Sequence, residues 1–280
     1  MGKVNFIHEL TTNIWYVGDW HSERYEKYNQ DVKLFEKRLS CWYPIGDDLF
    51  RIDHGPNYFN FFRRLGELFF YIAMNDQGNV IGTIACVRQK VGGKSTFYLC
   101  DLKIDPQERE KGHLRRLMWR ALPACALRCQ RFYAISMNDG GENNRVSAMS
   151  EHVIGAKNGG VLNIYCLEAK DMRRVVDQVT CFKGVKEKAR FLALFNVKDL
   201  VLKSTGKRMR VVHLCTGANE PWGMVYDGVQ DGFLHMFCTR GDSALSHGLG
   251  TMGIEPFGDA TIIHYGMEGV DWEFLETSAI

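Results

Sequence analysis

Two runs of strand-forming residues joined by a short turn most strongly limit what this chain can fold into. The runs are residues 68–74 and 80–87, and a Gly-containing loop, residues 75–79, joins them. Runs rich in β-branched and aromatic residues around such a loop predict an antiparallel hairpin. A turn at 92–93 then leads to a third predicted strand, residues 95–104. The core therefore begins as an antiparallel β-meander.

A helix and a further strand are predicted directly after this meander. The helix begins at Gly112, and Leu114, Leu117 and Ala121 recur at helical spacing, forming one apolar stripe. Residues 131–137 then form the next predicted strand. Strand, helix and strand in this order imply a parallel pair of strands. The predicted fold class is therefore α/β, with a mixed sheet.

The segment before the meander is predicted to be mainly helical. Residues 17–40 are rich in Tyr, Glu and Lys and predict a helix, and a strand at 4–8 or at 13–17 precedes it. Residues 44–48 predict a turn, and residues 57–65 predict a short helix with an aromatic face.

The last third of the chain is dominated by predicted strands. These strands lie at residues 210–216, 223–227, 233–238, 261–267 and 272–275, and residues 243–252 predict a helix among them. Strand, helix and strand follow one another here as they do in the N-terminal part. A degenerate second copy of the N-terminal fold is therefore one hypothesis for this region.

Composition limits the partners of the chain. Its 35 Lys and Arg against 33 Asp and Glu leave a net charge of +2, so the electrostatic footprint of a dedicated nucleic-acid-binding protein is missing. The longest apolar run, residues 68–74, is far shorter than the ~20 residues that span a bilayer. The nine cysteines include no CxxC pair, which is typical of reduced, buried thiols and disfavours a structural metal. We therefore expect a cytoplasmic protein without a nucleic-acid, membrane or metal partner.

The segment most informative about chemistry joins the third strand of the meander to the following helix. Four basic side chains surround Gly112 there: Arg109, Lys111, Arg115 and Arg116. The N-terminus of a helix presents unpaired N–H groups and the positive end of the helix dipole, which suits a pyrophosphate. A solvated charged turn is the alternative interpretation.

The order of these elements resembles the GNAT superfamily of acyl-CoA-dependent N-acyltransferases. The family pattern Gln/Arg-x-x-Gly-x-Gly/Ala is matched by Arg109 and Gly112, but position 114 is Leu. Gly82 also matches the glycine usual on the second strand of the family's hairpin. The resemblance covers about residues 65–150 and implies a GNAT-like fold with a mostly β C-terminal region. It suggests three parts: a GNAT-like acyl-CoA-binding domain at 1–168, a connector at 169–207 and a strand-rich region at 208–280.

The resemblance implies that acetyl-CoA or another acyl-CoA is a co-substrate, with no metal. Main-chain groups of the third strand would bind pantetheine, and the loop would bind pyrophosphate. This assigns cofactor contacts to Leu102, Lys103, Ile104, Arg109, Glu110, Lys111, Gly112, His113, Leu114, Arg115 and Asn144. Leu114 falls on the apolar stripe of the helix, so its side chain is expected to point inward. Asn144 opens the family's next motif, but Glu151 stands where the family has a Tyr that acts as general acid.

The reaction expected of such a fold needs a base that takes a proton from the acceptor amine. Strand alternation is expected to divide the candidates between two faces, with Leu102, Cys100 and Tyr98 on one and Asp101 and Lys103 on the other. Asp101, the only carboxylate nearby, and Tyr98 are the catalytic candidates. A base elsewhere that acts through water is a further alternative, and a Cys100 nucleophile is a fourth.

The functional hypothesis is therefore acyl transfer from acyl-CoA to the amine of a small molecule or peptide. The alternative is a catalytically inactive acyl-CoA-binding sensor or scaffold, because the customary acid and base positions are not occupied. Either protein could form a homodimer. The acceptor is not specified by the sequence, because acceptor specificity resides in variable loops and helices.

Overall fold

The computed structural model describes residues 13–17, 23–39, 42–45, 48–138, 145–185, 188–217 and 222–280. The chain forms two compact units, the first from Met1–Cys41 and Leu65–Phe132 and the second from Trp42–Arg64 and Tyr133–Ile280. The boundaries of these two units differ from the predicted domain boundaries. The reason is that β8 (Lys157–Glu168) pairs with two strands of the C-terminal part, so it belongs with them.

The first unit is built on antiparallel strands in the order β1-β4-β5-β6. These strands are β1 (Asn13–Val17), β4 (Glu67–Met74), β5 (Val80–Val91) and β6 (Lys94–Ile104). They confirm the predicted meander and one of the two positions predicted for the first strand. The other position, residues 4–8, lies outside the described residues. Gly78 N donates to the carbonyl oxygen of Asn75 at 2.9 Å and closes the predicted turn of the hairpin.

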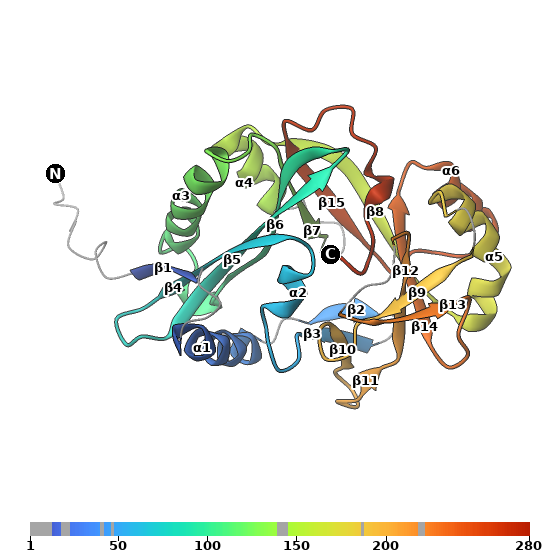
Figure 1. Ribbon diagram of the computed structural model, residues 1–280, viewed down its shortest axis with the longest axis horizontal. Coiled ribbons are helices and arrows are strands. Elements are labelled where there is room, and N and C mark those ends of the chain that lie inside the picture. The colour runs from blue at the N-terminus through green and yellow to red at the C-terminus, as the bar shows by residue number, and fades with distance from the viewer. Residues whose placement is uncertain are drawn as a thin grey trace. The chain divides into compact units, whose positions relative to one another are not determined.

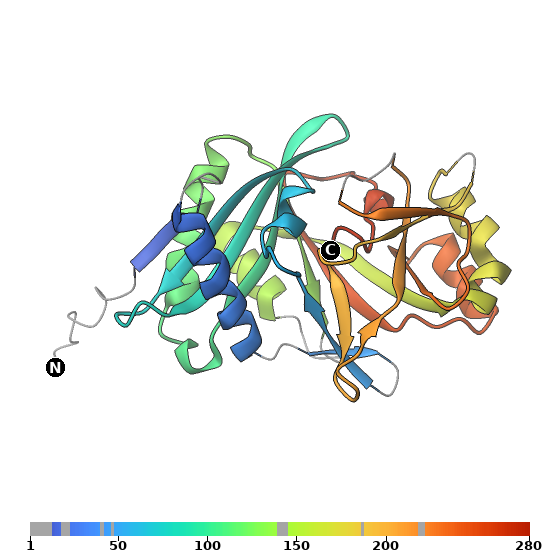
Figure 2. The same cartoon turned by 60° about the horizontal axis from the view of Figure 1, so that its bottom comes forward.

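Two helices of the first unit lie on opposite faces of these strands, as Figures 1 and 2 show. They are α1 (Glu23–Leu39) and α3 (His113–Ala126), and both confirm predicted helices. On α3, Leu117 and Ala121 are fully buried and pack in one cluster with Phe69, Tyr71 and other side chains of the sheet. This apolar face of α3 holds the helix on the sheet.

Gly82 on β5 allows the close approach of α3 and β6. A Cβ atom at this position would lie 2.6 Å from Ile104 Cδ1 and 3.1 Å from Leu117 Cδ1. These separations are shorter than ordinary van der Waals contacts, so any side chain would force the neighbours apart. The glycine therefore has a packing role in this unit.

The second unit contains strands in the order β7-β15-β8-β14-β12-β9-β13. They are β7 (Phe132–Met137), β8, β9 (Arg190–Ala193), β12 (Val211–Cys215), β13 (Met224–Asp227), β14 (Leu234–Arg240) and β15 (Gly258–Tyr265). β12 and β14 pair in parallel, whereas β14 and β15 each pair antiparallel with β8. Parallel and antiparallel pairs together confirm the predicted mixed sheet.

The last strand of the chain, β15, lies between two strands that come earlier in the sequence, β7 and β8. β14 and β15 lie on either side of β8, and α6 (Ala244–Thr251) connects them. This confirms the strand, helix and strand predicted in the C-terminal region. The strand predicted at 272–275 is wrong: the chain forms the 3-10 helix η3 (Trp272–Phe274), because the Asp271 side chain accepts a hydrogen bond from Glu273 N and caps a turn.

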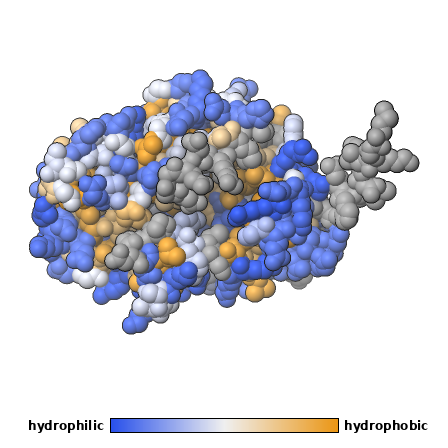
Figure 3. Space-filling model, turned by 180° about the vertical axis from the view of Figure 1, so that it is seen from behind, coloured by the Kyte–Doolittle hydropathy of each residue, from blue (hydrophilic) through white to orange (hydrophobic). Residues whose placement is uncertain are grey.

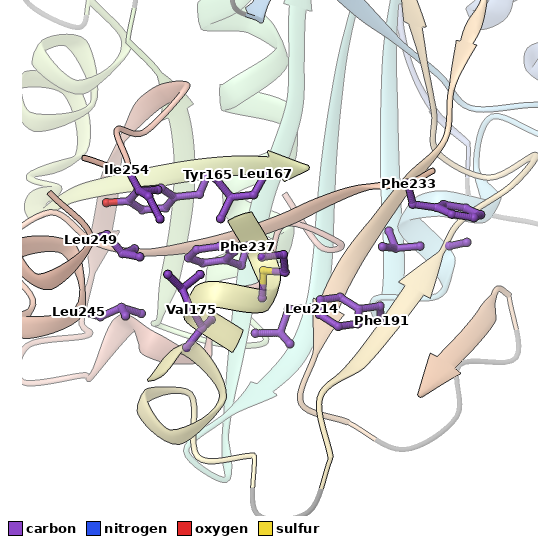
Figure 4. Packing of buried hydrophobic residues seen from close by; sticks show 14 residues of the cluster. Tyr165, Leu167, Val175, Phe191, Leu214, Phe233, Phe237, Leu245, Leu249 and Ile254 are labelled. Atoms are coloured by element: carbon purple, nitrogen blue, oxygen red, sulfur yellow. The ribbon is translucent and has the colours of Figure 1, made fainter. Parts of the chain in front are cut away.

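A large hydrophobic core lies between this sheet and the helices α5 (Ala169–Phe182) and α6, as Figure 4 shows. The Tyr165 ring of β8 stacks on the Phe237 ring of β14, with ring centroids 5.0 Å apart and planes 10° from parallel. Val175 of α5 and Leu249 of α6 are fully buried in the same cluster. Both helices thus belong to the core that the C-terminal strands form.

The second unit also includes a smaller sheet in the order β11-β10-β3-β2. Its strands are β2 (Tyr43–Ile45), β3 (Asp48–Asp53), β10 (Asp199–Leu202) and β11 (Arg208–Met209). Residues 42–64 therefore belong with the C-terminal part, although only a turn and a helix were predicted there. That predicted helix is confirmed as the short α2 (Asn60–Arg63).

Some large hydrophobic side chains are exposed, among them Trp119 and Leu127. Figure 3 shows one face on which hydrophilic residues predominate and hydrophobic residues are scattered between them. Within the described ranges, no helix is long and apolar enough to cross a membrane.

Candidate functional site

A β-bulge interrupts β6 within the segment that the sequence singles out. Lys103 pairs with Thr83 and Cys100 pairs with Ala85, so Asp101 and Leu102 together face one residue of β5. Asp101 has a φ angle of 53°, in the left-handed region that residues other than glycine rarely adopt. Thr83 Oγ1 donates a hydrogen bond to the carbonyl oxygen of Asp101 at 2.8 Å. The bulge withdraws Asp101 and Leu102 from the regular ladder with β5.

The bulge also changes which residues of β6 share a face. Phe97 and Leu99 before it, and Leu102 and Ile104 after it, all belong to the cluster packed around α3. The predicted grouping of Leu102 with Cys100 and Tyr98 is therefore wrong, because the extra residue reverses the alternation. Strand alternation places Tyr98, Cys100 and Lys103 on the face toward α1.

An ion-paired cluster occupies the α1 face beside the bulge. Lys103 Nζ lies 2.7 Å from Asp101 Oδ1 and 3.0 Å from Glu36 Oε1. The Asp101 side chain is only 3% exposed, and those of Lys103 and Glu36 are each 16% exposed. The ammonium thus bridges a carboxylate of β6 and a carboxylate of α1. Glu36 is a residue that the sequence analysis missed, since nothing in the helical pattern marks it as a neighbour of β6.

Tyr98 and Cys100 are two further side chains on this face of β6. Tyr98 is 4% exposed. Burial raises the pKa of the Cys100 thiol well above its usual range, and the adjacent Asp101 carboxylate adds to the rise. The thiol is therefore protonated near neutral pH, which argues against the Cys100 nucleophile considered as an alternative.

The loop after β6 leads into the N-terminus of α3 through a short 3-10 helix, η2 (Pro106–Glu108). Gly112 has a φ angle of 79°, and Arg116 N donates to its carbonyl oxygen at 3.1 Å, the first hydrogen bond of the helix. In the part of the chain that the structure describes, the N–H groups of Leu114 and Arg115 have no backbone acceptor. They remain available to an anion, as helix N-terminal N–H groups do.

The side chains of the loop divide into three groups. Glu108 Oε2 lies 3.0 Å from Lys111 Nζ and 3.2 Å from His113 Nε2, so these two predicted cofactor contacts face a carboxylate. The Arg115 guanidinium lies over the loop glycine, 3.8 Å from the place where a Cβ of Gly112 would be. Arg109 and Glu110 are exposed. The Arg115 guanidinium is therefore placed next to Gly112.

Leu114 is less buried than the later residues of the predicted apolar stripe. It is half-buried, whereas Leu117 and Ala121 are fully buried in the core cluster around α3. Apart from the Arg115 guanidinium, nothing lies within 4 Å of the place where a Cβ of Gly112 would be, so the space on this side of the glycine is open.

Helix α1 also contacts the loop directly. Arg38 Nε lies 3.2 Å from Asp105 Oδ2, and Arg38 donates to the carbonyl oxygen of Val80 at 2.6 Å. Asp105 in turn accepts a hydrogen bond from Gln107 N at 3.0 Å and caps η2. The start of the loop is thereby held to both α1 and β5.

The structure describes only part of the later motif. Asn144 falls outside the described residues, and Glu151 is exposed on α4 (Arg145–Ile154), together with His152. Among the side chains that the structure describes, no group of three or more His, Cys, Asp or Glu could hold a metal ion.

A known protein family matches the part of the chain that contains this site. Residues 17–147 match the model of the acetyltransferase (GNAT) family. This match confirms the predicted resemblance and the mixed α/β GNAT fold of this segment. No curated protein matches the chain by sequence.

Several solved structures are similar in fold to this chain. A tandem GNAT protein from the clavulanic acid biosynthesis pathway is 11% identical, with 90% of this chain and 98% of that chain covered and a TM-score of 0.49. The glucosamine N-acetyltransferase region of a fungal GH3 β-N-acetylglucosaminidase is 12% identical (coverage 91% and 38%, TM-score 0.47). The ribosomal-protein-S18-alanine N-acetyltransferase of Escherichia coli is also 12% identical (coverage 54% and 80%, TM-score 0.36).

Proposed function

Given that residues 17–147 match the GNAT acetyltransferase family, we propose that this protein transfers an acyl group from acyl-CoA to an amine. Acetyl-CoA is the first candidate for the acyl donor, and a small molecule or a peptide carries the acceptor amine. The observation that carries the proposal is the open N-terminus of α3 inside the matched segment. There the amides of Leu114 and Arg115 have no backbone acceptor among the described residues, and Arg115 folds over Gly112.

The proposed CoA site runs from the bulge of β6 to the first turn of α3. The main chain of Leu102, Lys103 and Ile104 would bind pantetheine, because the bulge beside them breaks the regular pairing with β5. The loop and first turn would bind the pyrophosphate through Arg109, Glu110, Lys111, Gly112, His113, Leu114 and Arg115. Asn144 remains a proposed contact of the same cofactor. The open space around Gly112 and the N–H groups of Leu114 and Arg115 fit an anionic group.

The reaction that we propose is direct attack of the amine nitrogen on the thioester carbonyl carbon. A C–N bond forms, the C–S bond breaks, a base takes the proton of the amine and the leaving thiolate takes up a proton. We propose Asp101 as the base or as the group that binds the acceptor amine, with Tyr98 as the alternative. Both would act on the α1 face of β6.

Calorimetric titration with acetyl-CoA, CoA and a longer acyl-CoA tests the cofactor site. We expect micromolar binding, and a loss of at least about tenfold in affinity when Arg109→Ala is combined with Gly112→Asp. The Asp side chain would place a negative charge where the phosphates bind. Arg120→Ala, an exposed change on the same helix, is the matched control and should leave the affinity unchanged. Unchanged binding in the double variant would contradict the placement of the pyrophosphate.

Thiol release from acetyl-CoA in the presence of an amine panel separates the enzyme from the alternative function. An acyl-CoA-binding sensor remains the second candidate, because the position of the family's general acid is Glu151, which is exposed on α4. Binding of CoA without transfer to any amine in the panel would favour the sensor. Amine-dependent thiol release would establish the enzyme.

A further inference from the structure

The conformation of Asp101 is unfavourable in itself and is held by its surroundings. A left-handed φ of 53° costs a non-glycine residue roughly 1–2 kcal/mol relative to extended backbone. Two contacts oppose this cost: the hydrogen bond from Thr83 Oγ1 to the Asp101 carbonyl oxygen and the ion pair between Asp101 and Lys103. Strained residues that are held in this way are concentrated at functional sites.

Charged side chains from two elements of the first unit meet beside the bulge. Asp101 is faced by Lys103 of its own strand and by the neighbouring Cys100 thiol, and Glu36 of α1 is paired with the same ammonium. β5 contributes Thr83, which carries no charge. The cluster therefore brings two carboxylates and one ammonium together in a largely buried place.

Stability alone is a weak explanation for this cluster. Removing two carboxylates and an ammonium from water costs free energy, and well-packed apolar side chains in the same place are often equally or more stabilising. The cluster does, however, fix the position of one carboxylate very well, since Lys103 Nζ is tied to both β6 and α1.

We propose that Lys103 is a positioning residue, which holds the Asp101 carboxylate on the α1 face of the bulge and is itself anchored by Glu36. This proposal rests on the proposed acyl transfer with Asp101 as the base. The main chain of Lys103 keeps its place beside pantetheine, whereas its side chain acts on Asp101. Glu36 acts on Asp101 only indirectly, by anchoring the Lys103 ammonium.

The test is the pH dependence of kcat/KM in three variants: Lys103→Met, Lys103→Arg and Glu36→Gln. Lys103→Met removes the ammonium that forms ion pairs with both Asp101 and Glu36, so the ionised form of Asp101 loses a stabilising charge. The acidic limb of the profile should therefore move up by about one pH unit, and Lys103→Arg should restore it. Glu36→Gln removes a like charge near Asp101, so the limb should move to lower pH.

Glu67→Gln is the matched control, because Glu67 forms an ion pair with Arg88 on the exposed side of the same unit. It should leave the profile unchanged. Calorimetric CoA binding by each variant reports whether the fold of the site is intact. If Lys103→Met does not fold, the test rests on the comparison of Glu36→Gln, which should move the acidic limb, with Lys103→Arg, which should not.

The outcomes separate this inference from the proposed function. Opposite shifts in Lys103→Met and Glu36→Gln support the inference, since a purely structural ion pair would lower activity without moving the limb. Acyl transfer with an unmoved limb in both variants overturns the inference and leaves the proposed function standing. No acyl transfer by the unaltered protein overturns the proposed function and the inference together.

Discussion

Lys198 Nζ donates hydrogen bonds to the carbonyl oxygen of Thr277, at 2.8 Å, and to that of Ile280. The lysine follows β9 and is only 7% exposed, and its ammonium lies 5.2 Å from the centre of the Phe61 ring. Burial lowers the pKa of Lys198 from 10.5 to about 7, and the nearby Arg64 charge contributes. One buried amine thus joins three distant parts of the second unit.

The stability of the protein should therefore rise with pH above neutrality. Between pH 7 and about 10.5, Lys198 binds a proton in the unfolded state but less so in the folded state, so the free energy of unfolding increases as pH rises. The increase from this one group is at most about 1.4 kcal/mol per pH unit. Urea unfolding at pH 7, 8 and 9 checks this against Lys198→Met, in which the contribution should be absent. Equal slopes in both proteins would contradict the assignment.

Acid should destabilise the same unit through His213. Burial lowers the pKa of His213 well below its usual value, and the charges of Lys198 and Arg64 add to the effect. Below about pH 6.5 the unfolded state takes up a proton that the folded state does not, so stability falls as the pH falls. Thermal unfolding at pH 5, 6 and 7 should show a weaker pH dependence in His213→Asn. His247→Asn, an exposed change on α6, is the control and should behave like the unaltered protein.

Gly82→Ala should destabilise the first unit by about 1–3 kcal/mol. Its Cβ would lie 2.6 Å from Ile104 Cδ1 and 3.1 Å from both Leu117 Cδ1 and the carbonyl oxygen of Lys103. Gly248→Ala on α6, where nothing lies within 4 Å, should instead stabilise the helix by about 0.5–1 kcal/mol. Denaturant unfolding of both variants measures the two effects. A neutral Gly82→Ala would show that α3 is not seated on β5 as described.

Two leucines three residues apart on α3 should respond very differently to truncation. Leu117→Ala removes a fully buried side chain from the core cluster and should cost about 2–5 kcal/mol. Leu114→Ala changes a half-buried side chain outside that cluster and should cost less than about 1 kcal/mol. Urea unfolding measures both costs, and similar values would contradict the orientation of the helix.

Local patterns were enough to predict most elements of this fold. The hairpin of β4 and β5, strand β6 and helix α3 form where the sequence predicts them, because turn residues and apolar periodicity act within a few residues. The loop around Gly112 was likewise predicted to open a helix N-terminus, and the positive φ of this glycine explains why a glycine is present.

Other features depend on partners far away in the chain. β3 pairs with β10, Asp53 opposite Asp199, and no local pattern of residues 44–53 indicates this partner. The 3-10 helix η3 is a local exception, because Asp271 caps a turn only two residues further along the chain, at Glu273 N, although residue composition favours a strand there. The partner of β3 is thus selected in the folded chain, whereas a cap within the segment selects η3.

The sequence by itself determined the hairpin, the loop and helix of the candidate site and the family that residues 17–147 match. Only the tertiary structure decided which side chains of β6 share a face, because a one-residue bulge reverses the alternation on which such a prediction depends. It also decided that Glu36, 65 positions before Asp101 in the sequence, meets Lys103 beside it. The periodicity of apolar residues reflects the local geometry of the chain. The partner of a charged side chain depends instead on how helices and strands pack together.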